Sequence, residues 1–546
     1  MGLPPALLPL RNAVFRNMWF AFVVTSLGVW LQNTGAGWLM TTLSPDPMTV
    51  SLVQAATILP MCLLALPAGA IADIVDRRLF LLLTQGWTMA AAALLATLTL
   101  MDLITVWSLL GLTFAIGIGS AMTAPAWGAL APELVPRQDL VQAIALNGIG
   151  FNLARAIGPA LGGVLVLVGG SGLTFALYAM SFIAVIAALL NWRRANATSS
   201  LPREHLLSAV RAGMRFVRNT PAMRAAMMRS FAYSVPAAAP WAMLPLVVHS
   251  QLGLGAGMYG LILGMMGLGG VTAGMLLPNL RGRVSRGTTV LGASVISCCG
   301  IALLALATHW IPACLGMVLF GMGWVTAYSS IQAAAQLVSP PWVRARALAI
   351  YQLSYNGALT LGTFGWGWVG AQIGLSNSLL AAAASGLLMA AAVRGFGLDS
   401  SATPAAAPRF KPQPLPEAPA AELAMSLPQT RRRILETMHY RVDPSQRRAF
   451  LAAMSDVRQV RGRAGAVDWQ LFEDVAHPEG WVETWMMESW TDHLREAARL
   501  SEDDMAVLDR AGAFQSGGGL PRPSRYISVD PEAYLHWTGQ TALPHS

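Results

Sequence analysis

Charged residues are scarce in this chain. Asp, Glu, Lys and Arg make up 12% of its 546 residues, whereas soluble globular proteins carry about 25%. Hydrophobic residues account for 55%, and the mean hydropathy is +0.52. This composition excludes an ordinary cytosolic enzyme. It also excludes a nucleic-acid-binding protein, in spite of a pI near 9.9.

Cysteine and lysine are also rare. Lys411 is the single lysine, and the four cysteines all lie in apolar runs, so no disulfide framework is expected. The sequence has no Gly-x4-Gly-Lys-Ser/Thr motif, which disfavours ATP-driven transport within this chain. In the C-terminal part, His439, His477 and His493 lack the spacing of metal ligands. We therefore predict neither a metal site nor a cofactor.

The charge is unevenly distributed along the chain. Residues 1–397 carry a net charge of +13, and residues 398–546 carry −4. Seven prolines between Asp399 and Gln429 indicate an extended linker between a membrane part and a soluble part. The predicted domains are a six-helix half (1–192), a cytoplasmic central loop with an amphipathic helix (193–224), a second six-helix half (225–397), the linker (398–430), a soluble domain (431–530) and a tail (531–546).

Twelve apolar segments approach or exceed the length of about 20 residues that a membrane-spanning helix needs. They lie at 17–40, 50–72, 79–100, 104–126, 140–168, 172–191, 225–248, 256–279, 287–307, 311–336, 346–371 and 375–395. Arginines lie in or next to the loops that follow the even-numbered segments. The loops that follow the odd-numbered segments contain neither Arg nor Lys. Because positive charge stays in the cytoplasm, we predict that both termini are cytoplasmic.

The two six-helix halves look like repeats of each other. Asn147-Gly148 and Asn356-Gly357 occupy matching places in the two halves, 209 residues apart. Parallel halves around a site at the bilayer midplane are typical of secondary transporters.

The loop after the second segment carries the first recognisable motif. It reads Gly69-Ala-Ile-Ala-Asp73-Ile-Val-Asp76-Arg77-Arg78, which resembles the loop 2–3 signature of the major facilitator superfamily, although that family usually has glycine in place of Asp76. The resemblance implies that this loop latches the two halves together on the cytoplasmic side. It gives a gating role to Gly69, Asp73, Asp76, Arg77 and Arg78. Acids beside arginines at a helix end can form ion pairs that exist in one conformer only, and a simple topology signal is the alternative.

The fifth segment carries a second motif, Gly150-Phe-Asn152-Leu-Ala-Arg155-Ala-Ile-Gly158-Pro159-Ala-Leu-Gly162-Gly163. Its small residues would let another helix approach closely. It resembles the helix-5 motif of exporters in the same superfamily. Together with the prolines and acid of residues 125–137, it is similar to the enterobactin-exporter-like branch, the transmembrane secretion effectors, over residues 10–395. The resemblance implies gating by Gly158, Pro159, Gly162 and Gly163, and ion-gradient-driven export of a small molecule. Ordinary helix packing is the alternative for these residues.

Arg155 is the one charged residue deep inside a predicted span. It lies about 24 Å along the helix from Asp139, within a bilayer core of about 30 Å. A buried arginine normally faces a cavity or a partner, and the acids of the sequence offer no partner within the membrane. Either an anionic or catechol-like substrate supplies the missing charge, or Arg155 has a packing or gating role. For proton coupling, the candidates are Asp73, His249 and His309.

Further polar and aromatic residues are predicted to line a substrate cavity together with Arg155. They are Asn152, Gln32, Asn33, Asn147, Tyr233, Tyr351, Gln352, Tyr355 and Asn356. For each of them, hydrogen bonding between helices is the alternative role.

The soluble part has the pattern βαββαβ. We expect strands at Ile434–Val442, Val467–Asp474, Trp481–Met487 and Tyr526–Val529, and helices from Pro444 to Gln459 and from Thr491 to Arg510. This order predicts an α+β ferredoxin-like domain. With Trp481, Glu483 and Trp485 on one strand, it resembles antibiotic-biosynthesis-monooxygenase-like domains, which usually pair. The resemblance implies a homodimer through this domain, and regulation and catalysis stay open as alternatives.

The sequence as a whole predicts a multi-pass α-helical protein of the bacterial inner membrane, with 12 transmembrane helices and a soluble ferredoxin-like domain. Its partners are a small-molecule substrate and the lipid bilayer, without nucleic acid. We predict a secondary active exporter of a siderophore, antibiotic or drug-like molecule that works by alternating access, with no catalytic residues. The alternative is a membrane-tethered enzyme or sensor whose C-terminal domain carries the activity.

Overall fold

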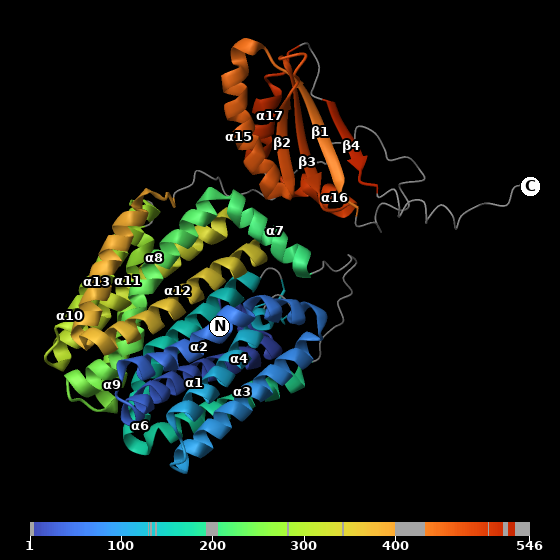
Figure 1. The fold of residues 1–546 in the computed structure, drawn as a ribbon. Helices are drawn as coiled ribbons and strands as arrows, with labels where there is room; N and C mark the ends of the chain where they lie inside the picture. Colours follow the sequence, from blue (N-terminus) through green and yellow to red (C-terminus); the bar gives the residue numbers. More distant parts are fainter. Residues whose placement is uncertain are drawn as a thin grey trace, which may run out of the picture. The chain divides into compact units, whose positions relative to one another are not determined.

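The computed structural model describes residues 5–128, 130, 134–136, 139–192, 206–280, 283–340, 343–398, 432–500, 502–516 and 522–529. The chain divides into two compact units. The first comprises Met1–Leu206, Ala225–Ala335 and Ala349–Asp399, and the second comprises Leu207–Arg224, Gln336–Leu348 and Ser400–Ser546. The first unit holds a helical bundle, and the second holds a small β-sheet with its own helices (Figure 1).

Eleven long helices form the bundle within the described chain. They are α1 (Ala13–Leu43), α2 (Pro47–Ile74), α3 (Arg77–Leu100), α4 (Val106–Gly128), α6 (Leu140–Asn191), α8 (Pro221–Leu246), α9 (Ala256–Leu280), α10 (Arg286–Ala305), α11 (Trp310–Val338), α12 (Arg344–Ile373) and α13 (Leu375–Ala392). Short helical turns precede α1 (η1, Pro5–Arg11) and follow α8 (η3, Val247–Gln251) and α13 (η4, Val393–Gly395).

Helix α6 holds two membrane spans. It is 52 residues long, and its helical geometry breaks at Gly169 and Gly170, where Gly170 has a φ of 70° that favours glycine. The predicted segments 140–168 and 172–191 lie on either side of this break. Ten helices of the described chain are long and apolar enough to cross a membrane, with α6 counted once and α12 outside that set. All twelve predicted segments coincide with helices, and the predicted fold class is confirmed.

The described acids of the first unit lie at helix ends. The carboxylates of Asp46 and Asp76 accept backbone N–H groups in the first turns of α2 and α3. Asp102 lies between α3 and α4, and Asp139 directly precedes α6. Asp73 belongs to the last turn of α2, and its side chain lies outside the described residues. Within the described part of the bundle, no carboxylate therefore lies in the middle of a helix.

The second unit contains α7 (Leu206–Asn219), the helix predicted within the central loop. Its polar side contacts the C-terminal domain of the same unit, because Arg215 Nη1 lies 3.1 Å from Glu488 Oε1. The apolar side chains of Phe216 and Val217 are buried.

The C-terminal domain has a four-stranded antiparallel sheet. Its elements are β1 (Ile434–Arg441), η6 (Pro444–Gln446), α15 (Arg447–Ala464), β2 (Asp468–Glu473), β3 (Gly480–Met487), α16 (Trp490–Arg499), α17 (Glu502–Gly512) and β4 (Arg522–Ile527). The strand order β2-β3-β1-β4 is that of a ferredoxin-like fold, as predicted. The prediction of one helix over 491–510 was wrong, because extended backbone at Leu500 separates α16 from α17.

Candidate functional site

Glycines let α6 and α9 touch through their backbones. A Cβ added at Gly163 would lie 2.7 Å from the Cα of Gly260, and a Cβ at Gly260 would lie 2.6 Å from the carbonyl oxygen of Pro159. Such distances leave no room for a side chain. Because α6 belongs to the first six-helix half and α9 to the second, this is a direct backbone contact between the two halves.

The other side of the same motif packs against α1. A Cβ at Gly158 would lie 2.5 Å from the Cβ of Trp30, and a Cβ at Gly162 would lie 2.9 Å from the Cβ of Thr34. The predicted close approach of a neighbouring helix is therefore confirmed, with α1 as the neighbour. A gating role for these residues stays a prediction.

A chain of aromatic rings connects the two halves. Trp30 of α1 stacks on Trp241 of α8 at 6.1 Å between ring centroids, and Trp241 meets Trp324 of α11 edge-on at 5.6 Å. Trp324 in turn lies 6.4 Å from Tyr355 of α12. The rings come from four helices, of which only α11 and α12 are consecutive in the chain, so the folded bundle brings the other rings to them.

A cavity opens beside these rings. Its volume is about 20 Å³, room for about one water molecule. It is lined by Trp30, Asn33, Gln54, Pro240, Trp241, Leu244, Tyr259, Leu263, Met317 and Phe320. The lining is mostly aromatic and apolar, with two amide side chains, which is typical of small-molecule sites.

Arg155 lies at the other end of the aromatic chain. Its Nη2 donates a 2.7 Å hydrogen bond to Oδ1 of Asn152, one turn earlier on α6. Tyr355 and Tyr328, whose rings are 5.0 Å apart, lie in the electrostatic neighbourhood of this charge. Across the described residues, no carboxylate pairs with this guanidinium. Arg155 and the cavity are thus joined through Tyr355, Trp324 and the other rings.

The structure brings some of the other predicted residues to this region. The hydroxyl of Tyr233 shares a 2.7 Å hydrogen bond with Ser297, and its ring lies 6.1 Å from that of Trp324. Gln352 donates to the hydroxyl of Tyr328 at 3.4 Å. Asn33 lines the cavity.

Other predicted cavity residues do not line the described cavity. Gln32 and Tyr351 are buried, with 2% and 1% of their surface exposed. Asn147 and Asn356 are half-buried. For these four residues, a part in substrate binding stays a prediction.

The predicted gating loop is partly described. Gly69 belongs to α2, and the side chain of Asp73 lies outside the described residues. Asp76 caps α3, and Arg77 begins that helix. Arg78 donates to the carbonyl oxygens of Leu189 and Leu190, at 2.8 and 2.6 Å, and so ties α3 to the end of α6 within the first half. The latch between the two halves stays a prediction.

Sequence reasoning missed the tryptophans of this site. Trp30, Trp241 and Trp324 lie in apolar runs, where a tryptophan is indistinguishable from a lipid-facing or packing residue. The fact that Trp30 lies near the amide residues Gln32 and Asn33 of the same helix was the one available signal.

The C-terminal domain has an unusually polar interior. Glu483 of β3 is fully buried and accepts hydrogen bonds from Tyr440, Arg461 and Trp469 at 2.9, 3.2 and 3.0 Å. Burial raises the pKa of the Tyr440 phenol, so its hydroxyl stays protonated and donates. The guanidinium of Arg461 also lies 3.7 Å above the ring of Trp485.

Comparisons with known proteins agree with this architecture. The family described as transmembrane secretion effector matches residues 5–533. The staphyloferrin A transporter of Staphylococcus aureus is 25% identical over 295 residues, which cover 52% of this chain and 71% of that protein. The enterobactin exporter EntS of Citrobacter koseri is 27% identical over 266 residues, which cover 48% of this chain and 62% of that protein.

Solved structures show the same fold at low sequence identity. A bacterial homologue of the iron transporter ferroportin in an inward-facing state aligns with a TM-score of 0.53 and 16% identity, over 70% of this chain and 99% of that one. The nucleoside transporter NupG aligns with a TM-score of 0.59 and 14% identity, over 70% and 99%. From its sequence and its fold, the chain belongs to the transmembrane secretion effector family of the major facilitator superfamily, and it is a multi-pass membrane transporter of a small molecule.

Proposed function

We propose that this transporter exports a small anionic molecule from the cytoplasm by alternating access, and that Arg155 binds the anion. The main observation behind this proposal is the set of groups that surround the Arg155 guanidinium. Its described hydrogen-bond partner is a neutral amide, so its positive charge has no counter-ion among the described residues. A cation at this depth in a membrane protein normally faces a partner or a cavity.

The aromatic rings beside Arg155 specify the chemistry further. Tyr355 lies near the cation, and the chain of rings leads from Tyr355 through Trp324 to the cavity. Such a site fits an aromatic anion, in which the ring stacks on the protein and the charged oxygens meet the guanidinium. Two relatives, an enterobactin exporter and a staphyloferrin A transporter, support a siderophore-like substrate.

The remaining parts of the proposal rest on the family and on the arginine pattern. We propose that an ion gradient drives export and that both chain ends are cytoplasmic, in the inner membrane. The homodimer through the C-terminal domain is also proposed. Phe472 and Tyr526 support it, because both are about half exposed on the face of the sheet opposite Glu436 and Glu483.

The test compares secreted small molecules in a strain lacking the gene with those in strains that re-express it, under iron-limited growth. We expect one anionic metabolite to accumulate in the deletion cells and to return to the medium on re-expression. With Arg155→Ala, the export rate should fall roughly 10- to 100-fold, the value of a hydrogen bond to a charged group. Arg155→Lys, which keeps the charge, should retain more activity than Arg155→Ala.

The control is Arg16→Ala, which removes an exposed arginine at the start of α1 and should export at the wild-type rate. If Arg155→Ala also exports at the wild-type rate, the anion site is wrong. If the metabolite is altered inside the deletion cells while its export is unchanged, the C-terminal domain carries the activity instead.

A further inference from the structure

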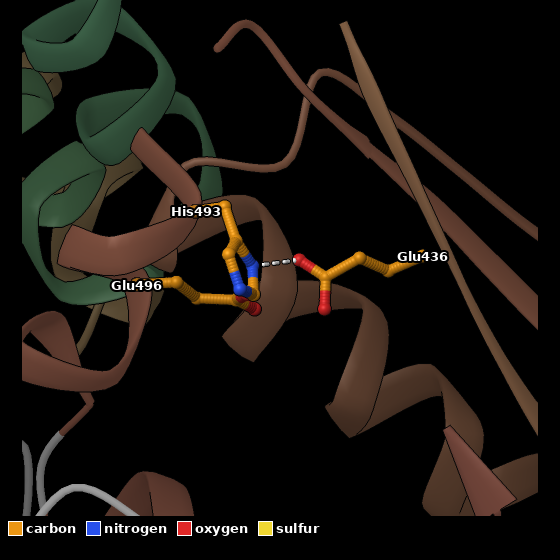
Figure 2. A group of neighbouring side chains, drawn as sticks. All are labelled: Glu436, His493 and Glu496. Carbon is orange, nitrogen blue, oxygen red and sulfur yellow. Dashed lines mark hydrogen bonds and ion pairs between the residues drawn. The ribbon is translucent and has the colours of Figure 1, made fainter. Parts of the chain in front are cut away.

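Three side chains with metal-binding atoms converge inside the C-terminal domain. Glu436 comes from β1, and His493 and Glu496 come from α16 (Figure 2). One ligand atom from each residue lies within 4.8 Å of the other two. Nδ1 of His493 and Oε1 of Glu436 share a 2.5 Å hydrogen bond, which a bound ion would have to replace. The three residues are 4%, 7% and 5% exposed, so this is an interior cluster and not a surface patch of acids.

The fold brings the cluster together from distant parts of the sequence. The register of the sheet pairs Glu436 with Trp485 of β3, which is itself buried beneath the helices, so Glu436 points to the same side. Ser489 caps α16 through the N–H of Asp492 and fixes where the helix begins. His493 and Glu496 are three residues apart, which places them on one face of that helix. No sequence spacing among the histidines could have revealed this arrangement.

The charges around the cluster do not balance. Three carboxylates are buried there, those of Glu436, Glu483 and Glu496. Two guanidiniums oppose them. Arg461 bonds to Glu483 and Glu496 at 3.2 and 3.0 Å, and Arg525 lies 3.6 Å from Glu436, longer than a hydrogen bond. The two guanidiniums thus face three carboxylates. Because an uncompensated buried charge is costly, the cluster calls for one more cation.

We propose that Glu436, His493 and Glu496 form a binding site for a divalent transition metal ion. One imidazole nitrogen and two carboxylate oxygens are a donor set that suits Zn²⁺, Mn²⁺ and Fe²⁺. The hydrogen bond from Arg461 to Glu496 then orients a ligand from outside the first coordination sphere. The bound ion would tie α16 to β1. This site is separate from the transport cavity and does not depend on the proposed substrate.

The experiment measures Zn²⁺ binding to the purified full-length protein in detergent. The protein carries no polyhistidine tag and is first treated with a chelator, and a chromophoric competitor reports the affinity. We expect the wild type to bind one Zn²⁺ per chain at this site. Any Zn²⁺ that all variants bind equally belongs to other sites and is subtracted. His493→Ala and Glu436→Gln should each weaken that affinity at least roughly 100-fold, because each removes a direct ligand.

Two controls separate this site from other donors. His477→Ala removes an exposed histidine of the same domain and should bind Zn²⁺ as the wild type does. The four free cysteines of the chain could bind the ion elsewhere, so Co²⁺ is used as a second ion. Co²⁺ bound by nitrogen and oxygen shows no sulfur charge-transfer band. Co²⁺ bound by cysteine shows this band.

Equal affinity in His493→Ala, Glu436→Gln and the wild type would overturn the proposal. Absence of the expected Zn²⁺ in the wild type would overturn it as well. If His493→Ala fails to fold, as judged by size-exclusion chromatography, His493→Gln is measured in its place. That variant keeps a polar group beside Glu436 and lacks the imidazole.

Discussion

At the scale of single residues, Arg461 holds the interior of the C-terminal domain together. It is 7% exposed, and its guanidinium contacts Glu483, Glu496 and the ring of Trp485. Removing one partner of a buried ion pair costs more than the pair contributes, because the remaining charges stay buried without compensation.

We therefore expect Arg461→Met to lower the free energy of unfolding of this domain by about 3–5 kcal/mol. Hydrogen exchange of the β1 and β3 amides in the full-length protein measures the change. Arg458→Met is the matched control, one turn earlier on α15. Its exposed guanidinium lies only above the ring of Trp469, so its loss should cost about 0.5–1 kcal/mol. Similar exchange in both variants would contradict a special role for Arg461.

The importance of some residues could be predicted from the sequence, whereas that of others could not. Arg155 stood out because it is a lone charge in an apolar helix, and the structure places it beside Tyr355 and Tyr328. The buried Glu483 was harder to recognise. It alternates with Trp481 and Trp485 on β3, so it shares their face, but a carboxylate at such a position is normally taken as solvent-exposed. Its burial is compensated by hydrogen bonds from three donors, which lie on β1, α15 and β2.

At the scale of elements, the backbone contact between α6 and α9 is the most specific interaction between the two halves. Small residues at helix interfaces let membrane helices pack closely, and Gly163 and Gly260 face each other without side chains. The proposed alternating access would require the halves to move against each other, so this contact would form and separate, or slide, in each cycle.

We expect Gly260→Val to reduce the transport rate roughly tenfold or more, because the added side chain would hold α6 and α9 apart. Gly274→Val is the matched control on the same helix, since a Cβ at Gly274 meets nothing within 4 Å. Both variants are reconstituted in vesicles at equal protein content, and substrate movement is measured. Comparable rates for the two variants would show that the close contact is not needed for transport.

Elements were predictable where local composition decides them. The apolar runs fixed the positions of the spans, and Gly169-Gly170 marked the break within α6. The break between α16 and α17 at Leu500 escaped prediction because no proline or glycine marks it. There, packing decides: Leu500 is buried against Val460 and Ala464 of α15.

At the scale of the whole molecule, the chain joins a transporter bundle to a folded C-terminal domain. The cavity, the aromatic chain and Arg155 all belong to the first unit.

If the bundle alone carries transport, a variant lacking residues 431–546 should keep most of its export. Export by this variant and by the full-length protein is compared in the deletion strain, after membrane insertion has been verified. Native mass spectrometry of both should show dimers only for the full-length chain. Complete loss of export from the inserted variant would favour the alternative in which the domain carries the activity.

The chain of rings from Trp30 to Tyr355 also has an optical consequence. Indole fluorescence responds to groups that stack on the ring or absorb near its emission, and Trp241 and Trp324 lie within 6 Å of each other beside the cavity. A bound catechol-like anion would quench this emission, so the transporter carries its own reporter of occupancy. A titration without any label could then rank unknown metabolites, and the difference between the wild type and Trp324→Phe would assign the signal to this site among the 18 tryptophans of the chain.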